Sequence, residues 1–288
     1  MRRTDRRRRP HLPTCQRVPA LSQPNALDLL SQGEVAVVGR LAQASNHAFL
    51  VTVTAGGTSL AAIYKPVSGE RPLWDFPDGT LAGRETAAYL ISAAGGWDVV
   101  PETVLRQGPR GVGSLQRWVG DPYADPEYVV DVVAPDAVPD GWVPVLRGEG
   151  ERGDPVVVVH EDSPAVAAVA VFDAVINNSD RKGSHLVREA GGVRGFDHGV
   201  SLHVDDKLRT VLWGFAGRPL PEVELDRLRR LDEALAGTAG RSALHSELAT
   251  HLTAAELDAL GARVRRLLAL PAYPLPGEGW PAIPWPPL

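Results

Sequence analysis

Two aspartates, Asp180 and Asp197, each stand in a short polar segment whose residue types suit phosphate chemistry. The first segment, 177–185, reads Asn-Asn-Ser-Asp-Arg-Lys-Gly-Ser-His, and the second, 195–199, reads Gly-Phe-Asp-His-Gly. A hydrophobic run over 166–176 leads into the first segment, and a predicted hairpin separates the two. In phosphoryl transfer, one carboxylate orients the attacking group and a second holds Mg²⁺ on the phosphates of ATP. The pattern therefore predicts that chemistry.

These segments resemble the catalytic and metal-binding loops of the phosphoinositide 3-/4-kinase-like branch of the kinase superfamily. In that branch an Asp-Arg dipeptide opens the catalytic loop, and Asp180-Arg181 stands in that place. An Asp in the Asp-Phe-Gly position closes the site, and Asp197 takes that place. The family usually has a metal-binding Asn five residues after the catalytic Asp, whereas this chain has His185.

In detail, the chain from about residue 34 to residue 215 is similar to an uncharacterised actinobacterial group of phosphatidylinositol kinase-like proteins. The resemblance implies an α+β, two-lobed protein-kinase-like fold, with an antiparallel sheet and a helix in the N-lobe and a mostly helical C-lobe. It also implies ATP as the nucleotide and Mg²⁺ or Mn²⁺ as the metal. Fold-level resemblance does not establish a lipid as the acceptor. The acceptor is therefore left open between a lipid, a protein and a small molecule.

Lysine is rare in this chain, which makes each lysine informative. The sequence contains 27 Arg and only three Lys, at Lys65, Lys182 and Lys207. Lys65 ends a strand-like run, and Glu85 follows twenty residues later inside a predicted helix. A strand Lys paired with a helix Glu at the nucleotide phosphates is the ion pair that kinases assemble. The alternative is a surface lysine and an unrelated glutamate.

The resemblance to kinases gives further candidate residues for nucleotide binding. Ser45 and Asn46 lie in a polar loop between two predicted strands, where N–H and hydroxyl donors could cover the phosphates. A plain hairpin turn is the alternative there. Gln116, Trp118 and Val119 fall in the predicted connector between the lobes, and adenine would hydrogen-bond to its backbone.

The catalytic roles follow from the order of residues in the first segment. Asp180 is expected to orient the nucleophile or to accept its proton late in the transfer. Arg181 and Lys182 come directly after it, and Arg181 or Lys182 would offset charge on the transferring phosphoryl group. The alternative for Asp180 is a helix-terminal carboxylate that bonds the backbone of its own loop.

The metal would be held chiefly by Asp197, with His185 or Asn178 as a possible second ligand. Histidine nitrogen is a poorer ligand for Mg²⁺ than an amide or carboxylate oxygen. The sequence therefore predicts either an altered use of the metal or a separate role for His185.

Composition limits the classes of protein to which this chain can belong. A chain of 288 residues with 44% hydrophobic residues can bury one large core or two lobes. No apolar run approaches the ~20 residues of a membrane span, so none is expected. The single cysteine, Cys15, excludes a disulfide framework and fits a reducing cytoplasm, where we expect the protein to be located.

Charge is distributed unevenly along the chain. The first nine residues contain six Arg and one Asp, a charge of +5, while the whole chain is −5, so residues 10–288 carry −10. A nucleic-acid-binding domain normally carries a basic face. We therefore expect no nucleic-acid binding by the folded part, and interpret the basic arm as a disordered tail.

Four regions are expected along the chain: a basic arm over 1–24, a nucleotide-binding N-lobe over 25–119, a catalytic C-lobe over 120–270 and a Pro/Trp-rich tail over 271–288. The expected N-lobe elements are a helix at 25–32, strands at 34–41, 48–54, 58–65, 99–106 and 113–119, and a helix at 81–94. The expected C-lobe elements begin with an insert at 121–155 that contains short helical or extended pieces. A buried helix follows, which the segment 160–164 opens, with Asp162 or Ser163 as its N-cap and Pro164 as its first residue, and which ends at 176. The remaining elements are a hairpin at 185–188 and 193–196, and helices at 221–236, 240–251 and 253–270.

Three functions remain open from the sequence. The first is an active ATP-dependent phosphotransferase acting on an unidentified small molecule or protein. The second is a pseudokinase, a nucleotide-binding or interaction module, which is favoured by His185 and by the lack of a clear glycine-rich loop. The third is a hydrolase that uses Asp180 and Asp197 with a metal but no nucleotide.

Overall fold

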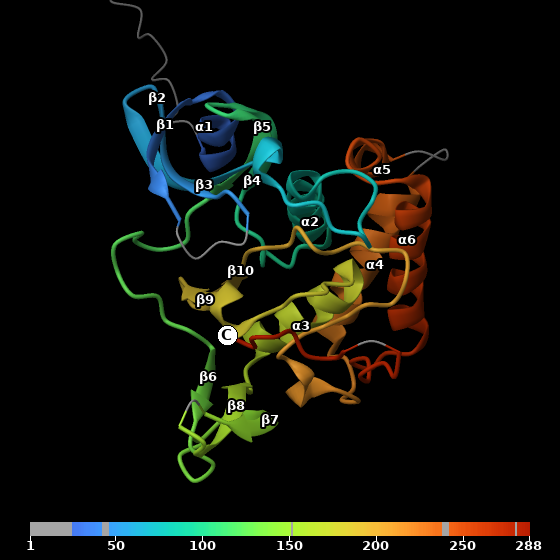
Figure 1. Cartoon of the computed structure of the whole chain (residues 1–288). Helices are drawn as coiled ribbons and strands as arrows, with labels where there is room; N and C mark the ends of the chain where they lie inside the picture. The colour runs from blue at the N-terminus through green and yellow to red at the C-terminus, as the bar shows by residue number, and fades with distance from the viewer. Residues whose placement is uncertain (1–24, 42–45, 151, 238–241, 280) are drawn as a thin grey trace, which may run out of the picture.

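The computed structural model describes residues 25–41, 46–150, 152–237, 242–279 and 281–288. Figure 1 shows a curved sheet that forms one lobe and a group of helices that forms the other. The basic arm with Cys15, and Ser45 of the polar loop, lie outside the described residues. None of the helices in the described ranges combines the length and the apolar character that crossing a membrane requires.

The first lobe is built on a five-stranded antiparallel sheet in the order β1-β2-β3-β5-β4, as the sequence predicts. Side chains along β2 alternate between buried and less buried, the pattern of a strand with one face on the core. The strands are β1 (Glu34–Arg40), β2 (Phe49–Ala55), β3 (Thr58–Pro66), β4 (Thr103–Gly108) and β5 (Gly111–Arg117).

Helix α1 (Ala26–Gln32) lies in the hollow of this curved sheet (Figure 1). Asn25 caps it, because the Asn25 side chain accepts a hydrogen bond of 2.9 Å from the Asp28 N–H. The buried side chains of α1 and the sheet form a small core of their own, which includes Leu30, Val51 and Leu115.

Helix α2 (Leu81–Gly95) connects β3 to β4 and belongs to both lobes. Thr80 caps its first turn and Gly96, with φ of 77°, ends it in the left-handed conformation that favours glycine. Its side chains Ala87 and Ile91 are fully buried in the core of the second lobe. The helix therefore links the sheet to the helical lobe.

The insert after β5, for which the sequence predicts short helical or extended pieces, forms a second sheet. Strands β6 (Val130–Val133), β7 (Trp142–Glu149) and β8 (Pro155–Glu161) pair antiparallel in the order β6-β8-β7. His160 and Glu161, which the sequence places in the segment that opens the main helix, instead end β8. The four consecutive valines at 156–159 explain the difference, because β-branched residues favour strands.

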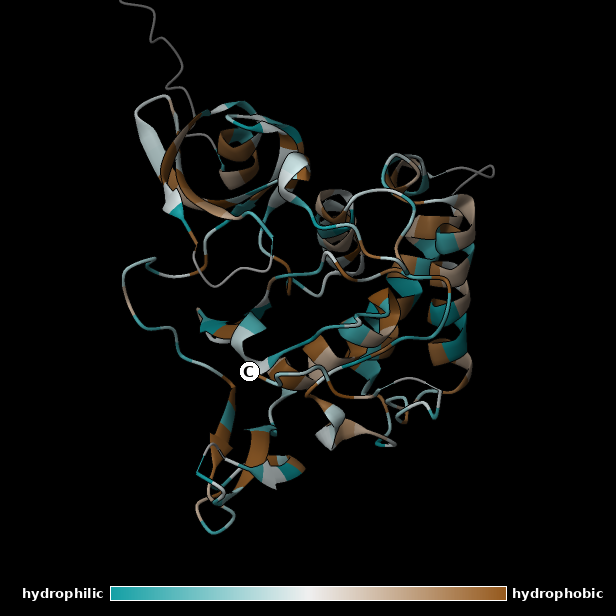
Figure 2. Cartoon of the chain, in the orientation of Figure 1, coloured by the Kyte–Doolittle hydropathy of each residue, from teal (hydrophilic) through white to brown (hydrophobic). Residues whose placement is uncertain are grey.

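Helix α3 (Pro164–Ile176) runs through the centre of the second lobe. The Ser163 side chain caps it and Pro164 occupies its first turn, as predicted. Ten of its 13 residues are buried, which Figure 2 shows as a largely hydrophobic ribbon. It ends at Asn177, whose φ of 53° turns the chain sharply into the segment that carries Asp180.

The remaining elements of the second lobe surround α3. They are the hairpin of β9 (Leu186–Glu189) and β10 (Gly192–Gly195), and helices α4 (Glu222–Ala236), α5 (Ala243–Leu248) and α6 (Ala254–Ala269). The chain after α6 is extended and packs along the lobe, where the Gly183 N–H donates to the Pro287 carbonyl at 2.8 Å. The α+β, two-lobed, kinase-like fold predicted from the sequence is confirmed.

Candidate active site

Lys65 and Glu85 meet at the junction of the two lobes. Lys65 lies near the end of β3, opposite Ser114 of β5, and Glu85 lies on α2. The Lys65 Nζ forms an ion pair with Glu85 Oε1, and the Glu85 side chain is only 4% exposed. The structure therefore confirms the predicted pair between a strand lysine and a helix glutamate.

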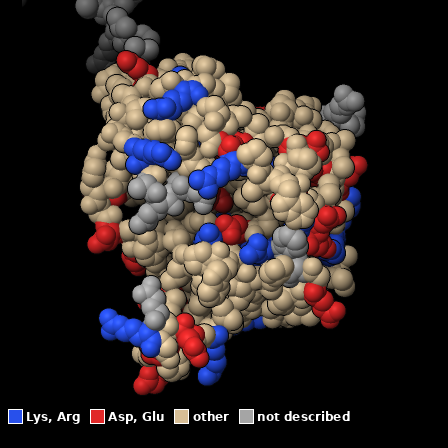
Figure 3. All heavy atoms as spheres, in the orientation of Figure 1, with Lys and Arg blue, Asp and Glu red and all other residues tan. Residues whose placement is uncertain are grey.

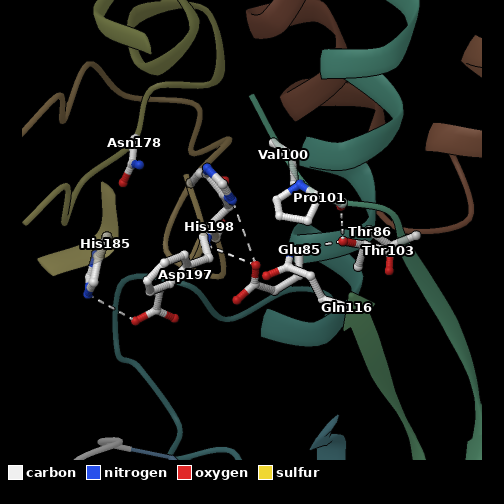
Figure 4. A network of polar contacts seen from close by, with 12 residues as sticks. Glu85, Thr86, Val100, Pro101, Thr103, Gln116, Asn178, His185, Asp197 and His198 are labelled. Atoms are coloured by element: carbon white, nitrogen blue, oxygen red, sulfur yellow. Dashed lines mark hydrogen bonds and ion pairs between the residues drawn. The ribbon is translucent and has the colours of Figure 1, made fainter. Parts of the chain in front are cut away.

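Lys65 also contacts Asp197, so that one ammonium joins both carboxylates. The Lys65 Nζ lies 2.7 Å from Asp197 Oδ1, and Glu85 Oε2 accepts a hydrogen bond of 2.9 Å from the His198 N–H. Figure 4 shows Glu85, Asp197 and His198 together at this junction. The arrangement brings β3, α2 and the loop after β10 to one point.

The charges at this junction support one another. Burial alone would lower the pKa of Lys65, but the carboxylates of Asp197 and Glu85 outweigh it and raise that pKa above its ordinary value. The charge of Lys65, opposed by burial, holds the pKa of Asp197 far below its usual range. Asp197 therefore stays ionised, and its side chain is half exposed. A half-exposed carboxylate of this kind can bind a cation.

The backbone at Asp197 is in an uncommon conformation. Its φ of 62° places it in the left-handed region, where Asp and Asn are more frequent than other non-glycine residues. Asn177, just before the other candidate loop, has a φ of 53°. Both loops of the site thus begin or turn at a left-handed residue, as is frequent at ligand-binding sites.

His185 lies directly beside Asp197. Its Nε2 is 3.4 Å from Asp197 Oδ2 (Figure 4), while its Nδ1 is buried and has no hydrogen-bond partner among the described residues. Burial lowers the pKa of His185 to about 4, so the imidazole is neutral at pH 7. The contact is therefore between a neutral ring and a carboxylate. The role of His185 in holding a metal stays a prediction.

Asn178, a predicted metal ligand, is buried and makes hydrogen bonds within the protein, and its role as a ligand stays a prediction. Asn178 is 1% exposed, and its Nδ2 donates to Asp173 Oδ1 at 3.0 Å while its Oδ1 accepts from the Asp180 N–H at 3.0 Å. Both ends of the amide are therefore used within the protein. Figure 4 shows Asn178 apart from the contact between His185 and Asp197. Its function is to hold the backbone of Asp180.

Of the two cations predicted to offset phosphoryl charge, Arg181 has its side chain in the core, which leaves Lys182 as the candidate for that role. Neither Arg181 nor its partner Asp173 has an exposed side chain, and Arg181 Nε lies 2.9 Å from Asp173 Oδ2. Arg181 also donates to the Phe196 carbonyl at 3.0 Å and lies 2.7 Å from His198 Nε2. The guanidinium therefore ties the loop of Asp180 to the loop of Asp197.

Asp180 itself faces outward, with its side chain 32% exposed. Burial raises the pKa of Asp180, while the nearby charge of Lys182 opposes the rise. The Lys182 Nζ lies 3.4 Å from Asp180 Oδ2. The predicted neighbourhood of Asp180 and Lys182 is therefore present, and their catalytic roles stay predictions.

Two residues of the site, Arg209 and Asp173, are not among those predicted from the sequence. Arg209 adds a positive charge that lowers the pKa of Asp180, and its N–H donates to the Asn178 carbonyl at 2.9 Å. It lies 29 residues after Asp180 in a segment with no motif. Asp173 could have been recognised from the sequence, since it is the one charged residue inside the otherwise apolar α3.

Strand β5 includes Gln116, the first residue of the predicted connector between the lobes. Gln116 lies inside β5 between β3 and β4, where the ladder uses its backbone groups, and its side chain donates to Thr103 Oγ1 at 2.8 Å. The Trp118 N–H donates to the Ala61 carbonyl at 2.9 Å. Gln116 and Trp118 are thus engaged in the sheet, and adenine contact by Gln116, Trp118 or Val119 stays a prediction.

Asn46, the described part of the polar loop, has a structural contact. Its Oδ1 accepts a hydrogen bond of 2.9 Å from the Arg71 N–H, which ties the two loops of the first lobe together. A role in covering phosphates stays a prediction for Asn46.

Replacement of Lys65 by methionine is expected to weaken ATP binding at least ~tenfold, because one hydrogen bond to a charged group contributes ~1.5–3 kcal/mol. Calorimetric titration with Mg-ATP measures this loss. Arg147→Met on the exposed face of β7 is the control and should bind as the parent does. Equal affinity of the Lys65 and control variants would exclude Lys65 from the nucleotide site.

The comparisons with known proteins give one strong relationship. No family model matches the chain. Over 267 residues it is 48% identical to Protein Rv2133c of Mycobacterium tuberculosis (strain ATCC 25618 / H37Rv), which covers 90% of this chain and 94% of that protein. A crystal structure of the Helicobacter pylori proinflammatory kinase CtkA aligns with a TM-score of 0.39 at 14% identity, over 82% of this chain and 96% of that one. By its identity and coverage, the chain belongs to the family of Protein Rv2133c.

Proposed function

We propose that this chain is an ATP-dependent phosphotransferase that acts on a small molecule or a protein. The observation that carries the proposal is the position of Lys65, which contacts Glu85 of α2 and Asp197 of the loop after β10 at one point. Kinases assemble this set of groups to bind the phosphates and the metal of Mg-ATP. Figure 3 shows acidic and basic side chains gathered in the hollow between the two lobes.

The donor set fits a single magnesium ion that is shared with phosphates. The described residues contain no group of three or more His, Cys, Asp or Glu that could hold a metal alone. Mg²⁺ is usually bound through one or two carboxylates together with substrate phosphates. Asp197 supplies the half-exposed carboxylate, and Lys65 would pair with the phosphates. When bound, Mg-ATP supplies the phosphoryl group and shields its charge.

Asp180 is the proposed catalytic carboxylate. It would accept the hydrogen bond of the acceptor hydroxyl, direct the oxygen toward the γ-phosphorus, and take the proton late in the transfer. Its raised pKa makes it a better proton acceptor than an ordinary aspartate. Lys182 and Arg209 place positive charge on the same side, where charge on the transferring group must be balanced.

The decisive test compares nucleotide binding with turnover in Asp180→Asn. We expect Mg-ATP affinity within ~twofold of the parent and a fall in turnover of ~100-fold or more, because the carboxylate acts mainly in the transition state. The raised pKa also places the acidic fall in the parent's rate at a higher pH than an ordinary aspartate would. Rate measurements from pH 4 to 8 should show this fall in the parent.

The control for this test is Asp140→Asn, since Asp140 is exposed in the loop before β7. It should leave both affinity and rate unchanged. Full activity of folded Asp180→Asn would contradict the catalytic assignment.

A pseudokinase is the second candidate, and the surroundings of Asp197 favour it. Asn178 is committed to Asp173 and Asp180, and His185 stands where the resembling family has a metal-binding Asn. A neutral imidazole thus stands beside Asp197 where the resembling family has an amide oxygen. Saturable Mg-ATP binding with no phosphotransfer to any acceptor, in the presence of Mg²⁺ or Mn²⁺, would favour this function over the first.

A further inference from the structure

The last residues of the chain lie against the loop that carries Asp180. The N–H of Gly183, three residues after Asp180, donates to the Pro287 carbonyl at 2.8 Å. A Cβ atom at position 183 would collide with the Leu288 side chain, so glycine is needed for this close approach. Figure 1 marks this end of the chain with C, close to β9. Residues 281–288, the terminal segment, are thus attached directly to the loop.

A second attachment joins the start of the terminal segment to Thr210. The Ala282 carbonyl accepts hydrogen bonds from the Thr210 N–H at 3.0 Å and from Trp213 Nε1 at 2.8 Å. Thr210 is only 3% exposed. Because buried N–H groups are nearly always paired in proteins, detachment of the segment would leave this donor without its acceptor.

The residues on both sides of Thr210 hold the loop of Asp180. The Arg181 N–H donates to the Arg209 carbonyl at 3.0 Å, and the Val211 N–H donates to the Arg181 carbonyl at 3.2 Å. Arg181 and Thr210 form a parallel bridge. The backbone next to Asp180 is therefore paired with the stretch around Thr210, and that stretch is in turn bonded to the terminal segment.

Apolar contact fixes the terminal segment in this place. The Ile283 side chain packs against the hydrophobic core of the second lobe, and Pro284 is buried. Trp285, the next residue, is 78% exposed. A charge at position 283 should therefore detach the segment, whereas a charge at position 285 should leave it in place.

We propose that the terminal segment is a positioning element, which holds Asp180 in place through its attachments at Thr210 and Gly183. The inference rests on the proposed function, because it takes Asp180 as the carboxylate that orients the acceptor. A displacement of ~1 Å caused by a change outside the site can lower a rate by ~100-fold. Lys65 and Asp197 would bind Mg-ATP from other elements, so the affinity for Mg-ATP should not depend on the segment.

The test compares Ile283→Asp with Trp285→Asp in the full chain. We expect Ile283→Asp to lower turnover at least ~tenfold and to keep Mg-ATP affinity within ~twofold of the parent. Trp285→Asp should match the parent in both measurements, and Ile283→Val, which keeps an apolar side chain, should keep the parent's turnover. Parent turnover in folded Ile283→Asp, or an equal loss of affinity and turnover, would overturn the proposal.

Amide hydrogen exchange, followed by mass spectrometry, tests the attachment without an assay of activity. Peptides that contain Gly183 and Thr210 should exchange faster in Ile283→Asp than in the parent, and at the parent's rate in Trp285→Asp. Unchanged exchange in Ile283→Asp would overturn the proposal. Faster exchange together with a parent that transfers no phosphoryl group would refute the proposed function instead, and would support the attachment of the segment to the loop.

Leu288→Asp decides if Ile283→Asp does not fold. Leu288 is 40% exposed, so a charge is tolerated there, but it would weaken the packing of the segment on Gly183. Exchange at Gly183 should rise and turnover should fall, while Mg-ATP affinity stays within ~twofold of the parent. Parent exchange or parent turnover in this variant would overturn the proposal.

Discussion

Asp197→Asn is expected to abolish phosphotransfer and to reduce the metal-dependent part of ATP affinity by ~100-fold or more. Asp197 supplies the carboxylate that would hold Mg²⁺, and it also pairs with Lys65 at 2.7 Å. The variant removes a charge that contributes to the bound ground state, so both affinity and turnover should fall. Titration with ATP in the presence and absence of Mg²⁺ measures the metal-dependent part.

Comparison of Asp197→Asn with Asp180→Asn distinguishes a role in metal binding from a role in the transfer itself. The two aspartates should differ, because Asp197 would act in binding and Asp180 in the transfer itself. Unchanged Mg²⁺ dependence in folded Asp197→Asn would refute the metal assignment. Loss of binding in both variants to the same degree would mean that Asp180 also holds the metal.

Arg181→Met is expected to lower the free energy of unfolding by ~3–5 kcal/mol, because it leaves the carboxylate of Asp173 buried without its partner. Both side chains are fully buried, and Arg181 makes further hydrogen bonds to the loop of Asp197. Urea unfolding at pH 7, followed by circular dichroism, measures the loss. A loss of this size is a large share of the stability of an ordinary folded domain.

The matched control is Arg229→Met, since Arg229 on α4 is half exposed and pairs only with surface acids. Its effect should stay within ~0.5 kcal/mol. If Arg181→Met were as stable as the parent but had lost turnover, the guanidinium would act in the chemistry and the core assignment would be wrong.

The sequence was sufficient for the sheet and for the centre of the site. Short strands with turn residues between them predict antiparallel pairs of chain neighbours, which β1-β2, β2-β3 and β4-β5 confirm, whereas the pairing of β3 with β5 does not follow from that rule. Because lysine is rare in this chain, Lys65 could be recognised as a candidate site residue. The helix that carries Glu85 lies within one residue of its predicted limits. Local patterns were enough for these features because each depends on residues close in sequence.

The positions of other residues at the site depend on contacts with residues distant in sequence or buried, which a local sequence pattern does not show. Arg181 turns inward because Asp173, eight residues earlier, is buried opposite it, and the carboxylate needs a partner. Gln116 stays in the sheet because β3 and β4 flank β5 on both sides. Arg209 is placed beside the site by hydrogen bonds with residues 178 and 181. Each outcome depends on a tertiary neighbour.

Helix α2 belongs to both lobes, which affects how the lobes can move relative to each other. The helix is fixed to the second lobe through Arg84, which is 1% exposed and pairs with Glu256 of α6. Lys65 stands on the sheet, so any rotation of the sheet away from α2 must stretch the contact between Lys65 and Glu85. Rotation of one lobe against the other would therefore change that ion pair, and a distance probe between β3 and α2 would measure the rotation directly.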